Sequence, residues 1–108
     1  MHFYAYHGCH EEEQKIGGNY IVDVSIETDF LTAAQFDDLS KTIDYCGVYE
    51  VSKKEMKKKS KLIETVGKKI FDALKKKEPT IKKLQVKITK LNPPINGNVE
   101  KVSVVISE

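Results

Sequence analysis

Alternating apolar and polar residues predict two long strands in this chain. Between residues 20 and 30, apolar side chains occupy nearly every second position, and acidic or hydroxyl side chains stand between them. Residues 84–90 repeat this alternation. A period of two is typical of antiparallel strands with one buried face. Shorter apolar stretches at 3–6 and 102–106 predict two further strands, the first of which should form a hairpin with residues 20–30.

Two helices are predicted between these pairs of strands. Apolar side chains recur at spacings of three and four across residues 45–56 and again across residues 63–74, which places them on one face of a helix. Thr42 or Asp44 could cap the first helix, and Ser60 is expected to cap the second, because side-chain oxygens accept hydrogen bonds from the free amides of a helix N-terminus.

The remaining segments are expected to be connections. The acidic run at residues 11–13 and the segment 31–41, rich in acidic and small residues, show no period of a helix or strand, and Pro79 marks the end of the second helix. The predicted order is strand, strand, helix, helix, strand, strand. This order indicates a single α+β domain over residues 1–108, with a four-stranded antiparallel sheet and two helices on one face.

The charged residues argue against nucleic acid as a partner. All 18 basic residues are lysines, and the net charge is only +2 at pH 7. Arginine supplies the planar fork that most often contacts guanine and phosphate, so its absence disfavours sequence-specific recognition. The lysine clusters at residues 53–61 and 75–77 are expected to be solvated helix surfaces. No apolar run approaches the ~20 residues of a membrane span, and no signal peptide is evident.

The cysteines and histidines do not indicate a metal or disulfide framework. Cys9 and Cys46 have no C-x-x-C spacing. His7 and His10 flank Cys9 and superficially resemble a metal pair, but zinc sites usually need three or four protein ligands. We therefore expect no metal, and a location in a reducing cytoplasm.

One lysine occupies an apolar position of a predicted strand. Lys90 is in phase with Val86 and Ile88, and it stands just before Asn92 and a proline pair that must end the strand. Its side chain either extends past the end of the sheet to water or points into a site there. The pattern alone favours neither reading.

Three further positions could take part in chemistry. Glu64 is expected in the first turn of the second helix, where the helix dipole favours a carboxylate and where two N–H donors of a heterocycle could also be bound. Tyr45 begins the first helix and is either a core ring or a catalytic group. Glu13 ends the acidic run and is either solvated or part of a site.

Five motifs resemble those of one enzyme family. Residues 3–8 (FYAYHG) are similar to its opening F-Y-G-Y-H-G segment, and residues 13–17 (EQKIG) to its E-x-x-x-G loop. Residues 37–45 (DDLSKTIDY) resemble its D-[DN]-x-x-x-T-[IV]-x-Y segment. Residues 62–64 (LIE) and 88–95 (ITKLNPPI) resemble its L-L-E and K-x-N-P-P motifs. In this order the motifs span nearly the whole chain, which thus resembles dihydroneopterin aldolase, a family with the tunnelling fold.

The chain departs from the family pattern in two respects. Ala5 and Cys46 replace common glycines. Family members usually carry several residues before the first motif, whereas Met1 falls almost on it here, so we expect a short first strand.

The resemblance implies an activity and an assembly. The family cleaves 7,8-dihydroneopterin by a retro-aldol reaction to 6-hydroxymethyl-7,8-dihydropterin and glycolaldehyde in folate biosynthesis. It needs no metal, Schiff base or other cofactor, because the pterin ring accepts the electrons. Four subunits close their sheets into a barrel, and two such rings commonly stack as a homo-octamer. The alternatives are an epimerase of dihydroneopterin or its triphosphate, and a non-catalytic oligomer that binds pterins or purines.

The resemblance also implies roles for individual residues. Lys90 would transfer a proton near a ring nitrogen, and Tyr45 would handle the proton of a side-chain hydroxyl. Four side chains would bind the pterin substrate: Glu13, Ile43, Ile63 and Glu64. Glu64 and Lys90 would come from one subunit, and Ile43 and Tyr45 from its neighbour.

Overall fold

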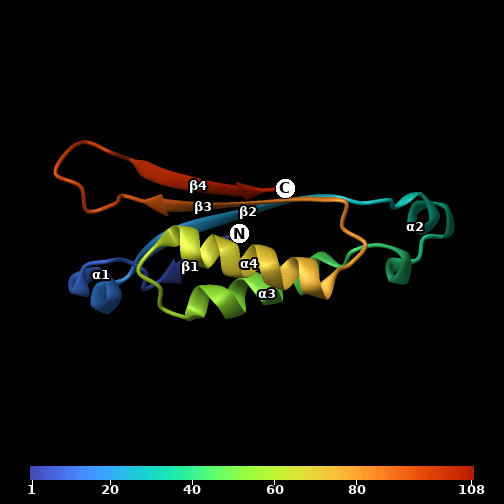
Figure 1. Cartoon of the computed structure of the whole chain (residues 1–108), viewed down its shortest axis with the longest axis horizontal. Helices are drawn as coiled ribbons and strands as arrows, with labels where there is room; N and C mark the ends of the chain where they lie inside the picture. Colours follow the sequence, from blue (N-terminus) through green and yellow to red (C-terminus); the bar gives the residue numbers. More distant parts are fainter.

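A four-stranded antiparallel sheet forms one layer of the molecule, and two long helices form the other (Figure 1). The computed structural model describes all residues from 1 to 108. The strands pair in their order along the chain: β1 (His2–Ala5), β2 (Gly18–Glu27), β3 (Lys83–Leu91) and β4 (Lys101–Ser107). The predicted α+β class and the predicted hairpin of the first two strands are confirmed.

The two predicted helices are α3 (Tyr45–Lys57) and α4 (Ile63–Lys77), and both lie on the same side of the sheet (Figure 1). Asp44 caps α3, because its carboxylate accepts a hydrogen bond of 2.9 Å from the backbone N–H of Cys46. α4 ends two residues before Pro79, as predicted. No helix is long and apolar enough to cross a membrane.

The hydrophobic core lies between α4 and the two central strands. The side chains that α4 buries against the sheet repeat at three and four residues: Ile63, Val66, Ile70 and Leu74. The strands oppose them with alternating buried positions: Tyr20, Val22, Leu84, Val86 and Ile88. Each fully buried aliphatic side chain stabilises the fold by about 1.5–3 kcal/mol. This packing fixes which face of β3 points inward, and with it the direction of Lys90.

Two segments expected as loops contain short helices instead. Residues 11–13 begin α1 (Glu11–Ile16), and the segment 31–41 holds α2 (Leu31–Phe36) and the 3-10 turn η1 (Leu39–Lys41). Three acidic residues in the first turn of α1 complement the helix dipole. α1 buries no residue and α2 only Ala33, so neither could show an apolar period in the sequence.

Two boundaries were also predicted wrongly. β2 ends at Glu27 rather than at residue 30, because its partner β3 begins only at Lys83, the residue that pairs with Glu27. Ser60 does not cap α4: the helix begins at Ile63, and its N-cap residue is Leu62. Ser60 is buried instead, and its backbone N–H donates to the side chain of His7.

The packing of α4 predicts that substitutions at two adjacent residues of this helix differ in their effect on stability. Ile70→Ala should lower the free energy of unfolding by about 2–5 kcal/mol, because it removes a fully buried side chain and leaves a cavity. Lys69→Ala, one position along and exposed, should change it by no more than about 0.5 kcal/mol. Urea denaturation measures both values, and equal effects would contradict the placement of this face of α4 in the core.

Candidate active site

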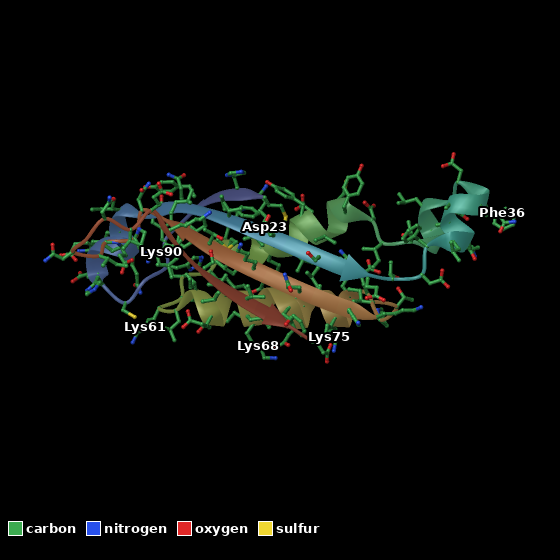
Figure 2. The ribbon with its side chains drawn as sticks, turned by 90° about the horizontal axis from the view of Figure 1, so that it is seen from above. Asp23, Phe36, Lys61, Lys68, Lys75 and Lys90 are labelled. Carbon is green, nitrogen blue, oxygen red and sulfur yellow. The ribbon has the colours of Figure 1, made fainter.

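Four of the six predicted site residues meet in one pocket, at the end of the sheet where β3 ends. The pocket has a volume of about 320 Å³, and the predicted residues that line it are Glu13, Ile63, Glu64 and Lys90. They come from α1, α4 and β3, so the fold joins segments that lie far apart in the sequence. Figure 2 shows Lys90 at this end of the sheet, and Phe36 of α2 at the opposite end of the molecule.

Lys90 points inward, in phase with the core residues of β3. It stands opposite Tyr20 of β2 and Val102 of β4 in the sheet register. Only 17% of its side chain is exposed, and its ammonium group donates a hydrogen bond to Oε2 of Glu13. The ammonium nitrogen also lies 6.0 Å from the centre of the Tyr20 ring. The reading in which Lys90 extends to water is therefore wrong.

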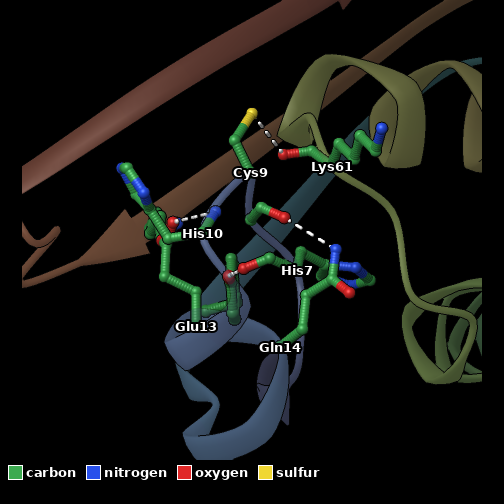
Figure 3. A network of polar contacts seen from close by, with 9 residues as sticks. His7, Cys9, His10, Glu13, Gln14 and Lys61 are labelled. Carbon is green, nitrogen blue, oxygen red and sulfur yellow. Dashed lines mark hydrogen bonds and ion pairs between the residues drawn. The ribbon is translucent and has the colours of Figure 1, made fainter.

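Glu13 is held in place from two sides. Its Oε1 accepts a hydrogen bond of 3.4 Å from the backbone N–H of His10 (Figure 3). Its Oε2 accepts the one from Lys90. Gly8 leaves room for it: φ is +149° there, and a Cβ would come within 2.5 Å of the Glu13 carboxyl carbon. Only glycine tolerates both the backbone angle and this close approach.

The environment of Glu13 keeps it ionised. Burial alone would raise its pKa, but the hydrogen bonds from Lys90 and from the His10 backbone, together with the charge of Lys90, lower the pKa below its ordinary value of 4.5. The carboxylate is thus a hydrogen-bond acceptor at neutral pH and holds no proton to donate. In this pair, only the ammonium group of Lys90 carries protons that could be transferred.

Glu64 faces the same pocket but has no partner within the chain. It lies in the first turn of α4 and is exposed, and its carboxylate takes part in none of the ion pairs. Beside it, Ile63 is 8% exposed and contributes an apolar wall. The pocket therefore combines a free carboxylate, an apolar surface and a paired ammonium group.

Tyr45 and Ile43 lie outside this pocket in the single chain. Tyr45 is the first residue of α3 and 81% exposed, so the alternative in which it is a core residue is wrong. It lines a separate, mostly apolar groove with Met1, Val22 and Val24. Ile43 is half-buried and packs against the core. Neither side chain contributes to the pocket of Lys90 from within the same chain.

Several residues of the pocket were not predicted from the sequence. The additional lining residues include Cys9, His10, Lys61, Pro93, Pro94, Ile95 and Val102. The proline pair was visible as the end of β3, and it could have been read as a rigid wall beside Lys90. Cys9 and Lys61 offered no such signal, because only the folded chain brings them together, with the Cys9 thiol 3.5 Å from the carbonyl oxygen of Lys61 (Figure 3).

No three side chains of His, Cys, Asp or Glu are grouped so that they could hold a metal ion. Cys9 and Cys46 are both free thiols. The absence of a cofactor and the cytoplasmic location both stay predictions.

Solved structures of the same fold carry names that concern pterin chemistry. The dihydroneopterin aldolase of E. coli in complex with neopterin superimposes with a TM-score of 0.87 at 18% identity, over 100% of this chain and 96% of the other. The dihydroneopterin aldolase of Burkholderia thailendensis bound to guanine gives a TM-score of 0.77 at 17% identity, over 100% and 84% of the two chains. These similarities support the fold.

Sequence comparison identifies the family. The family model described as dihydroneopterin aldolase matches residues 1–107. The dihydroneopterin aldolase of Bacillus subtilis is 37% identical over 108 residues, which cover 99% of this chain and 90% of that protein. The resemblance seen in the five motifs is thereby confirmed over the full chain, and with it the aldolase activity in folate biosynthesis. This chain belongs to the dihydroneopterin aldolase family.

Proposed function

We propose that the pocket between Glu64 and Lys90 is where this aldolase binds 7,8-dihydroneopterin and cleaves it to 6-hydroxymethyl-7,8-dihydropterin and glycolaldehyde. One observation carries the assignment. The pocket presents an unpaired carboxylate on one wall and, on another, an ammonium group that Glu13 holds in a fixed position. In this proposal the pterin binds to the carboxylate and receives a proton from the ammonium group.

Glu64 anchors the heterocycle. Pterins carry a 2-amino group beside a ring N–H, and a carboxylate can accept both through its two oxygens. Hydrogen bonds to an ionised acceptor are stronger than neutral ones. Neopterin and guanine, found in the two solved relatives, share this donor edge. Ile63 packs against the ring face, so the pocket selects a flat heterocycle with two adjacent donors.

Lys90 supplies the proton that the ring takes up during bond cleavage. A base removes the proton of the hydroxyl on the second carbon of the side chain, and that C–O bond becomes the C=O of glycolaldehyde. The bond between the first and second side-chain carbons breaks, and its electron pair enters the conjugated C=N of the ring. Lys90 then protonates the ring nitrogen, directly or through water. The resulting enol-type intermediate moves a proton from nitrogen to carbon and becomes the hydroxymethyl product.

Tyr45 of a neighbouring subunit handles the hydroxyl proton, and Ile43 of the same neighbour flanks the ring. Both residues lie away from the pocket of their own chain, and the Tyr45 ring is almost fully exposed. An exposed aromatic ring of this kind is typical of a surface that a partner covers. The complete site therefore requires two copies of the chain.

The sheet has the edges that such an assembly needs. β1 and β4 are the two edge strands, and every neighbouring pair in the sheet is antiparallel. Strand β4 of one copy would therefore run antiparallel to β1 of the next, as neighbouring strands within the sheet do. A head-to-tail contact of this kind closes into a ring when the rotation allows. In a closed ring of four copies, alone or stacked with a second ring as an octamer, every edge strand pairs with a strand of the neighbouring copy.

The first prediction separates binding from turnover. Lys90→Ala should reduce formation of glycolaldehyde from 7,8-dihydroneopterin by about 10²–10⁴-fold, because it removes the proton donor, while neopterin still binds, because the Glu64 anchor is kept and only Glu13 loses its partner. Lys87→Ala, on the opposite face of β3, is the matched control and should keep activity. Full turnover in Lys90→Ala would refute its role.

Two further assays use the wild-type protein. Repeating the turnover assay with a chelator tests the prediction that no metal takes part, and chiral analysis of the recovered substrate detects epimerisation.

The second prediction concerns the anchor. Glu64→Gln should weaken neopterin binding by about 10–100-fold, because the amide provides a single neutral acceptor and presents an N–H group to the substrate. Isothermal titration calorimetry measures the affinity. The control is Asp72→Asn, which removes a carboxylate from the same helix that only pairs with Lys68. Equal affinities for Glu64→Gln and the wild type would rule out the anchor.

The third prediction tests the shared site. Lys90→Ala and Tyr45→Ala subunits, each inactive alone, should regain activity when they are co-expressed. In a randomly mixed ring about one quarter of the sites combine an intact Lys90 with an intact Tyr45 from the neighbour. Mixing Lys90→Ala with Glu64→Ala should restore nothing, since both residues come from one chain. Recovery in the second mixture but not in the first would contradict the arrangement.

A further inference from the structure

A buried histidine lies next to the pocket and takes no part in the chemistry proposed above. His7 follows β1 and is only 1% exposed. Its ring packs edge-on against the ring of Tyr20, with 5.3 Å between the ring centres and 79° between the planes. Tyr20 is also buried, and its hydroxyl donates a hydrogen bond of 2.9 Å to the carbonyl oxygen of His7. Both the side chain and the backbone of His7 are therefore fixed.

His7 joins two segments that lie 53 residues apart. The backbone N–H of Ser60 donates to its Nδ1 at 3.1 Å. The next residue adds a second link, because the N–H of Gly8 donates to the carbonyl oxygen of Ser60 at 2.9 Å. The thiol of Cys9 contacts the carbonyl of Lys61 one residue further along. The segment 7–9 is thus fastened to the segment 60–61 by three successive contacts.

These two segments carry different parts of the pocket lining. Gly8 provides the space for the Glu13 carboxylate, and its carbonyl oxygen accepts a hydrogen bond of 2.8 Å from Gln14 of α1 (Figure 3). The other segment leads within four residues from Ser60 to Glu64. The contact between His7 and Ser60 therefore links the segment that makes room for Glu13 to the segment that leads to Glu64.

We propose that His7 is a positioning residue, whose neutral imidazole fixes Glu64 relative to the Glu13–Lys90 pair by accepting the hydrogen bond from Ser60. This inference rests on the proposed function, because it assigns His7 to the binding of the same pterin. His7 does not contact the reacting atoms. Its contribution is the geometry of a pocket whose two charged walls belong to different elements.

The role requires an unprotonated ring nitrogen. Nδ1 can accept from Ser60 only if it carries no proton, so the proton of the neutral ring lies on Nε2, which is buried and has no hydrogen-bond partner. If the ring took up a second proton, the N–H at Nδ1 would point at the backbone N–H of Ser60. The contact with Ser60 would then be lost, and the connection to Glu64 would loosen.

The groups around His7 favour the neutral ring. Burial lowers its pKa below the ordinary value of 6.5; the carbonyl of Met56 on α3 opposes this shift, and the positive charges of Lys90 on β3 and Lys69 on α4 add to it. Tyr20 of β2, whose pKa is raised by burial, is uncharged beside it. Because the folded state lowers the pKa, the contribution of His7 to stability is complete above pH 6.5 and is lost as the pH falls below it.

Two substitutions at this position distinguish positioning from simple packing. In His7→Asn the side-chain oxygen can take the place of Nδ1 as the acceptor, and it does not titrate. In His7→Phe the ring is kept and the acceptor is lost, which leaves the Ser60 amide buried without a partner. The test measures two quantities on each assembled protein: its affinity for neopterin, and the hydrogen-exchange protection of the Ser60 amide at several pH values.

His7→Phe should lose at least about tenfold in neopterin affinity and in Ser60 protection at neutral pH, whereas His7→Asn should keep both within about threefold. In the wild type, the hydrogen-exchange protection of the Ser60 amide should decrease as the pH is lowered below 6.5, and in His7→Asn it should not. Wild-type values in His7→Phe, or equal losses in both variants, would overturn the proposal. If the wild type bound no neopterin, the proposed function would fail, while the protection of Ser60 would still decide whether His7 joins the two segments.

Discussion

The ion pair between Lys90 and Glu13 is the interaction on which the arrangement of the pocket depends. Both side chains are largely buried, at 17% and 13% exposure, so each charge needs the other: an unpaired charge in such a place is strongly destabilising. The pair therefore constrains the elements that carry it. β3 must keep the register that turns Lys90 inward, α1 must form so that Glu13 faces it, and residue 8 must be a glycine.

The two carboxylates of the pocket differ because their surroundings differ. Glu13 is enclosed, accepts two hydrogen bonds and has a lowered pKa, so it is already satisfied before any ligand arrives. Glu64 lies at an exposed helix N-terminus without a partner. The first keeps a cation in position, and the second is free to receive hydrogen-bond donors. A preorganised charge next to an unsatisfied one is the general pattern of a binding site that also performs chemistry.

Much of this could be predicted from the sequence, because the core imposes a period on it. The strict alternation in residues 84–90 placed Lys90 in phase with the core residues of β3 but did not decide between a site and water, and the spacing in α4 predicted the helix that carries Ile63 and Glu64. The short helix α1 could not be predicted in this way, since it buries no residue and so leaves no period. The contact between His7 and Ser60 was equally hidden, because it joins a side chain to a backbone amide 53 residues away.

The proposed placement of Tyr45 at the site of a neighbouring copy rests on the same electrostatic argument. Retro-aldol cleavage needs one group that gives a proton to the ring and another that takes a proton from the side-chain hydroxyl. Within the pocket, both oxygens of the Glu13 carboxylate are engaged, by Lys90 and by the His10 backbone, so Glu13 is not free to take this proton, and in the proposed reaction Lys90 serves as the donor. The acceptor must approach the substrate from another direction. In the single chain Tyr45 is not among the residues that line this pocket, and its exposed ring lies on a different surface. A neighbouring copy that brings Tyr45 to this pocket would supply the acceptor, which is the physical reason to expect that catalysis depends on assembly.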